Sequence, residues 1–136
     1  MSYSYVIDAY AWIEYFRASG EGKGASGYIE EENSATPTIV VAEVSRKLTM
    51  EVLAGREEQD GKEKRLEFIR ASTQIIDLDF DVAKLAGKID IERKRLVKNW
   101  GMADSIILAS ARSARAKVVT GDNHFKDLDE EVVMIE

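Results

Sequence analysis

Hydrophobic residues along this chain fall into two alternating kinds of segment. Short runs rich in β-branched residues have the length and composition of buried strands. These runs occupy residues 5–7, 36–40, 74–78, 116–120 and 132–135. Between them, hydrophobic residues recur every three or four positions, which predicts amphipathic helices. The predicted helices cover residues 9–16, 41–52, 66–71, 82–96 and 103–115.

Two connecting segments lack this periodicity. Residues 19–27 contain four glycines and are predicted to form a loop, with residues 28–29 beginning or ending a short helix. The highly charged residues 56–64 are predicted to form an exposed turn. Gly55 is typical of the residue that follows a helix, and Asp79 of the residue that precedes one. The helix after Asp79 is predicted to bury a stripe made of Val82, Leu85, Ala86, Ile89 and Leu96.

The alternation of strands and helices predicts an α/β fold. Strands joined by helices run parallel and need helices on both faces, so we expect an α/β/α sandwich with a mostly parallel central sheet. The length of 136 residues fits a single domain over residues 1–136.

Composition narrows the possible chemistry. The chain has no Cys and one His, which excludes thiol nucleophiles, disulfides and thiolate zinc sites within it. The net charge of −6 argues against non-specific coating of nucleic acid, although a local basic patch remains possible. No apolar run is long enough for a membrane span, and no basic leader precedes residues 5–7, so a cytoplasmic location is expected.

Four carboxylates follow strands or open helices of the predicted sheet. The functional crevice of an open parallel sheet lies at the carboxyl ends of its strands, so acids there are the first candidates for chemistry. They are Asp8 after the first strand, Glu43 after the second, Asp104 at the start of the last helix, and Asp122 after the strand ending at Thr120.

Each acid also has a purely structural explanation, because carboxylates favour helix N-termini and turns. Asp104 and Asp8 fit that explanation less well. Asp104 is in line with Leu108 and Ala111 on the apolar side of its helix, and Asp8 directly follows a buried strand. Carboxylates that converge on one site need raised pKa values or divalent cations. With so few nitrogen or sulfur ligands, Mg²⁺ or Mn²⁺ is the expected ion.

Four segments match a known family in order and spacing. They are residues 5–8 (YVID), 40–44 (VVAEV), 101–107 (GMADSII) and 119–125 (VTGDNHF). On these segments the chain resembles the PIN-domain nucleases, and most closely the small VapC-type toxins of toxin–antitoxin pairs. The resemblance extends over nearly the full length.

The resemblance implies a metal-dependent ribonuclease whose acids hold one or two Mg²⁺ or Mn²⁺ ions. It makes Asp8 and Asp104 direct ligands, Glu43 a ligand or a nearby base, and Asp122 a residue that acts through water. It further implies an RNA substrate, an antitoxin partner and a homodimer.

The chain departs from the family pattern at two places. The family commonly has Thr or Ser directly after the first acid, whereas Ala9 and Tyr10 follow it here. A further Asp is common where His124 stands, and a lone imidazole beside Phe125 is expected to be a surface or packing residue. Thr120 is a candidate hydrogen-bond partner for one of the acids.

Large aromatic and basic residues have two possible uses. Trp12 and Trp100 could stack on bases, but core or dimer packing is the commoner use in a small domain. The helical regions around Trp12 and Tyr28 offer apolar surface for a homodimer. Basic residues could contact phosphate or could simply be solvated. They are Lys62, Lys64, Arg65, Arg93, Lys94, Arg95 and Lys98.

Two other functions fit the same pattern. A catalytically inactive PIN-like domain could bind RNA or a protein, but it would have no need to keep four mutually repelling acids. A phosphotransfer or phosphatase domain would place a second Asp at position 10, where Tyr10 stands.

Overall fold

The computed structural model describes residues 2–136 and contains one parallel sheet. Among these residues the strand order is β3-β2-β1-β4-β5, and every neighbouring pair is parallel. The strands are β1 (Tyr5–Ile7), β2 (Ser34–Pro37), β3 (Gln74–Ile76), β4 (Lys117–Thr120) and β5 (Val132–Met134). The predicted parallel sheet is therefore confirmed.

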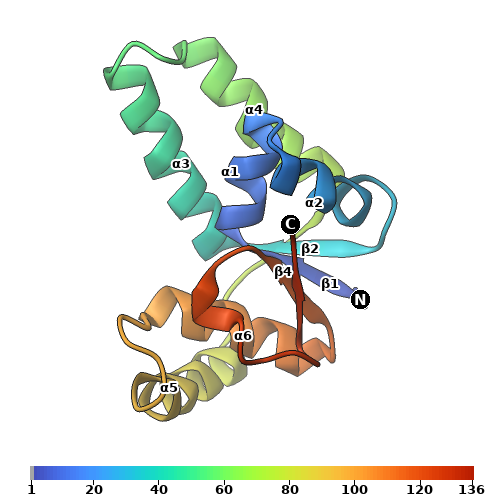
Figure 1. Cartoon of the computed structure of the whole chain (residues 1–136), viewed down its shortest axis with the longest axis vertical. Helices are drawn as coiled ribbons and strands as arrows, with labels where there is room; N and C mark the ends of the chain where they lie inside the picture. Colours follow the sequence, from blue (N-terminus) through green and yellow to red (C-terminus); the bar gives the residue numbers. More distant parts are fainter. Residues whose placement is uncertain (1) are drawn as a thin grey trace.

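Helices cover both faces of this sheet. In Figure 1, α1 to α4 lie above the strands and α5 and α6 lie below them, which makes an α/β/α sandwich. The helices are α1 (Ala9–Arg17), α2 (Gly20–Glu30), α3 (Thr38–Leu53), α4 (Gln59–Ser72), α5 (Phe80–Lys94) and α6 (Met102–Ala114), with a short 3-10 helix η1 (Asn123–Phe125). None of the helices formed by residues 2–136 is long and apolar enough to cross a membrane.

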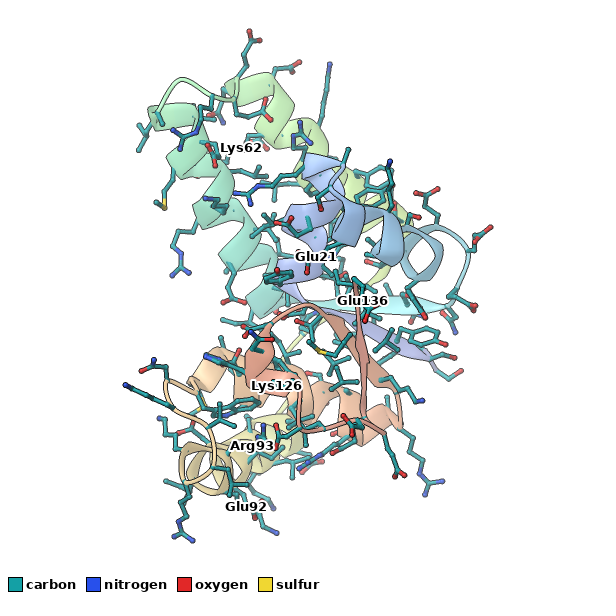
Figure 2. All side chains as sticks on the ribbon, in the orientation of Figure 1. Glu21, Lys62, Glu92, Arg93, Lys126 and Glu136 are labelled. Carbon is teal, nitrogen blue, oxygen red and sulfur yellow. The ribbon has the colours of Figure 1, made fainter. Side chains whose placement is uncertain are left out.

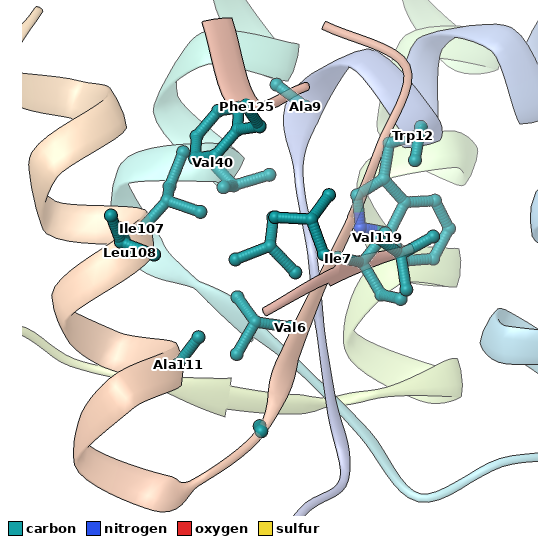
Figure 3. Packing of buried hydrophobic residues seen from close by; sticks show 14 of the residues in the cluster. Val6, Ile7, Ala9, Trp12, Val40, Ile107, Leu108, Ala111, Val119 and Phe125 are labelled. Atoms are coloured by element: carbon teal, nitrogen blue, oxygen red, sulfur yellow. The ribbon is translucent and has the colours of Figure 1, made fainter. Parts of the chain in front are cut away.

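The core forms on both sides of the central strand. Val6 and Ile7 are consecutive in β1 and both fully buried, as expected for a strand covered on two faces. Figure 3 shows them between Trp12 of α1 and the α6 side chains of Ile107 and Leu108. The central strand and the two helices next to it are therefore held rigidly in place.

The order of the strands predicts a crevice at the carboxyl ends of β1 and β4. From β1 the chain moves outward to β2 and β3, and it then returns across the sheet to place β4 on the other side of β1. This reversal is a topological switch point, where the connections after two adjacent strands depart to opposite faces. Asp8 and Thr120 stand at the carboxyl ends of these two strands.

The predicted loop at residues 19–27 is wrong, because residues 20–27 belong to α2. Ser19 caps this helix by accepting a hydrogen bond from the Gly22 N–H (3.0 Å). A Cβ at Gly22 would lie 2.1 Å from the Glu14 carbonyl oxygen of α1. Gly22 is therefore required for the close packing of α2 against α1. Local sequence patterns cannot distinguish such a glycine from a loop glycine.

The second predicted strand is displaced. It begins at Ser34 and ends at Pro37, and the β-branched residues after Pro37 start α3 instead. Val40, Val44 and Leu48 form one buried stripe of that helix, so packing overrides the strand preference of the local run.

Two smaller predictions also need correction. Residues 59–64 of the predicted turn form the first part of α4. Leu96 is 73% exposed because α5 ends at Lys94, so it does not extend the buried stripe. The predicted cap at Asp79 is confirmed, since its Oδ1 accepts from the Val82 N–H (2.8 Å).

Candidate functional site

Asp8 lies at the centre of the switch-point crevice. It ends β1 and caps α1, and its Oδ1 accepts a hydrogen bond from the Ala9 N–H (2.7 Å). Its Oδ2 accepts from the Thr120 hydroxyl at the end of β4 (2.7 Å), which confirms the expected contact between Thr120 and an acid. The same hydroxyl oxygen accepts from the Asp122 N–H (3.0 Å). Thr120 thus ties the first acid to the turn that carries the last one.

The Asp8 carboxyl is only 4% exposed. Burial raises its pKa to about 7, and the negative charges of Glu43 and Asp104 add to that rise, while the hydrogen bonds from Thr120 and Ala9 oppose it. A buried acid without a cation therefore holds its proton up to neutral pH.

Glu43 reaches the same region from α3. Its pKa is raised by partial burial and by the nearby charges of Asp104 and Asp122, and Arg46 partly offsets this effect. The structure thus brings all four predicted site acids into one electrostatic cluster, from β1, α3, α6 and the segment after β4.

Two of these acids also cap the start of the helix next to them. Asp104 Oδ2 accepts from the Gly101 N–H (3.2 Å) at the start of α6. Asp122 Oδ1 accepts from the His124 N–H (2.9 Å) and starts η1. Both acids therefore serve as helix caps, as the structural explanation expects. Their charges also raise the pKa of Glu43.

His124 is the site residue that sequence reasoning missed. Its Nδ1 lies 3.0 Å from Asp104 Oδ2 and 3.8 Å from Asp122 Oδ1, so the ring belongs to the acid cluster as well as packing beside Trp100. Its position two residues after a candidate acid, in a turn that folds back on itself, was the available signal.

Ligand atoms for a cation are present among the described residues. One oxygen each from Asp104 and Asp122 and one ring nitrogen of His124 lie within 4.8 Å of one another. Burial and, to a smaller extent, charge repulsion raise the pKa of Asp8 and Glu43, and a bound divalent cation would offset both effects. The donor set therefore fits a divalent metal ion.

Comparison with known proteins agrees with this fold. The family model described as PIN domain matches residues 5–131. The chain belongs to the PIN domain family. None of the curated proteins compared by sequence matches this PIN domain.

Solved structures with the same fold include toxin–antitoxin proteins. This PIN domain is similar to a toxin–antitoxin complex from Klebsiella pneumoniae (TM-score 0.72, 22% identity, 96% of this chain and 97% of that chain). It is also similar to VapBC2 from Rickettsia felis bound to a promoter DNA fragment (0.71, 17%, 97% and 98%). A third is VapC20 from Mycobacterium tuberculosis, a sarcin-ricin loop cleaving toxin (0.70, 14%, 92% and 95%).

The two tryptophans of this PIN domain are core residues. Trp12 is fully buried and donates its indole N–H to the Thr36 hydroxyl (3.1 Å). Trp100 is also buried and donates to the Ser105 hydroxyl (2.8 Å). Neither indole is available for stacking on a base, and Trp12 offers no surface for a dimer.

Most of the candidate phosphate contacts are committed to acidic partners. Lys64 pairs with Asp60, Arg65 with Glu57, and Lys94 with Asp90. Among the described residues, Lys62, Arg95 and Lys98 make no ion pair. In Figure 2, Lys62 lies in the α3–α4 region, far from Arg93 at the opposite end of the molecule. The basic residues therefore do not form one patch.

The buried Arg93 binds the segment after β4 that carries the candidate site residues. It is 5% exposed, and its guanidinium makes two hydrogen bonds of 2.8 Å to the carboxylate of Asp127. Its Nη2 also donates to the His124 carbonyl (2.9 Å), and the guanidinium lies over the Trp100 ring (4.6 Å to the ring centre). These contacts fix the turn that presents Asp122 and His124.

Ala9 stands where the family commonly has Thr or Ser, and Tyr10 follows it. The Tyr10 hydroxyl donates to the Glu21 carboxylate (3.0 Å to each oxygen), and a Cβ at Gly121 would lie 2.4 Å from the Tyr10 ring. The hydroxyl that contacts Asp8 comes from Thr120 instead.

Proposed function

We propose that this PIN domain is a divalent-metal-dependent endoribonuclease and the toxin of a toxin–antitoxin pair. The observation that carries the proposal is the convergence of four acids from separate elements around the buried Asp8, whose pKa is raised to about 7. Acids that repel one another in a rigid crevice lower the stability of the fold, so their presence supports a functional use. The toxin–antitoxin structures with the same fold support the choice of substrate and partner.

The proposed roles are those that the resemblance to PIN-domain nucleases implies. Asp8 and Asp104 are direct metal ligands, Glu43 is a ligand or a base beside them, and Asp122 acts through water. Divalent ions held there would activate water and neutralise charge on the phosphate and the leaving oxygen. Thr120 keeps the Asp8 carboxylate in one orientation, and the raised pKa of Glu43 brings it closer to the range useful for accepting a proton.

RNA cleavage in the presence and absence of metal tests the proposal. A mixed RNA pool is incubated with the protein in Mg²⁺, Mn²⁺ or EDTA, and the cut sites are mapped. We expect cleavage with either metal, none in EDTA, and a loss of at least about a hundredfold in Asp104→Asn. Asp129→Asn, the same change at an exposed site, is the matched control and should cleave normally.

Two results would contradict the proposal. Undiminished cleavage in excess chelator would exclude metal dependence, and equal cleavage by Asp104→Asn would indicate a contaminating nuclease. RNA binding without cleavage under every metal condition would favour the inactive PIN-like domain. An RNA-cleaving toxin would act in the cytoplasm, where its substrate is made.

The proposed antitoxin should present a basic or aromatic segment to the acidic crevice. An Arg guanidinium could occupy the position of the cation and form paired hydrogen bonds with two of the carboxylates. Co-purification from the native host tests this proposal. Partners that are acidic at their contact surface would show that the crevice is not where they bind.

A homodimer is also part of the proposal. Its apolar surface cannot come from Trp12, which is buried, but a groove lined by Ile39, Ile76, Leu78 and Ile106 lies between α3, β3 and α6. We expect light scattering at micromolar concentration to give twice the chain mass of 15.2 kDa. A mass of one chain would contradict the dimer.

A further inference from the structure

His124 adds the chain's one imidazole to a site otherwise made of oxygen donors. We infer that His124 is a metal ligand and makes the site favour transition-metal ions such as Mn²⁺, Co²⁺ and Ni²⁺ over Mg²⁺. This inference rests on the proposed metal site and assigns its ion selectivity.

The distance between His124 and Asp104 fits two ligands of one ion. Around an octahedral ion with bonds of about 2.1 Å, adjacent ligand atoms are about 3.0 Å apart and opposite ones about 4.2 Å apart. His124 Nδ1 lies 3.0 Å from Asp104 Oδ2 and 3.8 Å from Asp122 Oδ1. The separation from Asp104 matches two adjacent ligands of one ion, whereas the separation from Asp122 matches neither value, as expected for a residue that acts through water.

Hydrogen bonds to the His124 backbone fix the position of its imidazole ring. The His124 N–H donates to Asp122 Oδ1 (2.9 Å), and the His124 carbonyl accepts from the buried Arg93 (2.9 Å). The side chain is 30% exposed, so one part of the ring faces the acids while an ion can still enter. A backbone fixed on both sides reduces the entropy that a ligand loses when it binds.

The nitrogen donor of His124 then determines which metal ions the site prefers. Mg²⁺ favours carboxylate, carbonyl and water oxygens, whereas imidazole nitrogen suits ions such as Ni²⁺ and Zn²⁺. Replacing one oxygen donor by nitrogen thus weakens the relative affinity for Mg²⁺. The alternative explanation of the 3.0 Å contact is a hydrogen-bonded pair between His124 and Asp104 with no role in metal binding.

Spectroscopy of the wild-type protein separates these explanations directly. Because the chain has a single His, protein without a polyhistidine tag can be labelled with ¹⁵N-histidine at one position only. Pulsed electron paramagnetic resonance of bound Mn²⁺ should show hyperfine coupling to this nitrogen, and the coupling should change with the isotope. Bound Mn²⁺ without such coupling would overturn the inference, while the proposed nuclease site would stand.

Selectivity is measured by calorimetry of the wild type and His124→Asp with Mg²⁺ and with Ni²⁺. The added carboxylate strengthens binding of both divalent ions, so the ratio of the two dissociation constants isolates the effect of the imidazole. We expect the preference for Ni²⁺ to fall at least about tenfold in His124→Asp, because the nitrogen donor that suits Ni²⁺ is replaced by an oxygen donor that suits Mg²⁺.

An unchanged ratio in a folded His124→Asp protein would overturn the inference. Thermal melts in EDTA establish that the variant is folded, and the labelled wild-type measurement decides the question if it is not. Failure of every ion to bind the wild type would overturn both this inference and the proposed metal dependence.

Discussion

Asp8→Asn should stabilise the metal-free protein at alkaline pH. The usual pKa of this carboxyl is 3.8, and burial with nearby Glu43 and Asp104 raises it to about 7 in the folded chain. One pKa unit corresponds to about 1.4 kcal/mol, so ionising Asp8 inside the fold costs about 4 kcal/mol relative to the unfolded chain. The amide side chain of Asn carries no charge and avoids this cost.

The direction of the pH dependence follows from proton linkage. Below pH 3.8 the carboxyl is protonated in both states and contributes nothing. As the pH rises, the unfolded chain releases this proton first, so wild-type stability falls until the folded carboxyl also ionises near pH 7. Above that pH the destabilisation is complete and constant.

Against this gain, the amide has a single acceptor oxygen and cannot accept from both the Ala9 N–H and the Thr120 hydroxyl as the carboxylate does, at a cost of about 1 kcal/mol. We therefore expect Asp8→Asn to be more stable than the wild type by about 3 kcal/mol at about pH 8.5, and equal within about 1 kcal/mol at about pH 4.

Urea unfolding in EDTA across this pH range measures the effect. Asp129→Asn is the control, because the same change at an exposed residue should alter stability by less than about 0.5 kcal/mol throughout. A stability difference between Asp8→Asn and the wild type that stays the same from acid to alkaline pH would refute the reasoning. Added Mn²⁺ should reverse the order, because only the wild type keeps the ligand.

Two further predictions concern the packing around the site. Gly22→Ala should destabilise the fold by at least about 2 kcal/mol in urea unfolding, since its Cβ would meet the Glu14 carbonyl at 2.1 Å. Gly87→Ala, in a helix with open space, should instead stabilise by about 1 kcal/mol, and equal effects would contradict the packing argument. Asp127→Asn should lower the free energy of unfolding by about 2 kcal/mol and weaken Mn²⁺ binding in calorimetry, because it leaves the buried Arg93 charge without its partner. An unchanged Mn²⁺ affinity would show that this pair does not position the site.

The sequence alone determined the order of the strands along the chain and the candidate acids. Short β-branched runs and helical periodicity are local properties, so β1, the cap at Asp79 and the parallel sheet were all predictable. Strand ends and helix starts can be predicted from the same local patterns. For that reason Asp8 and Asp104 could be selected as candidate site residues before their surroundings were known.

Only the tertiary structure decided features that depend on distant neighbours. The helix at α2 requires the fit of Gly22 against α1, and the raised pKa of Asp8 requires burial beneath charges from α3 and α6. His124 enters the acid cluster because Arg93, 31 residues earlier, holds its carbonyl. Contacts between segments far apart in sequence leave no local periodicity, so the nitrogen donor of the site could be identified only in the folded chain.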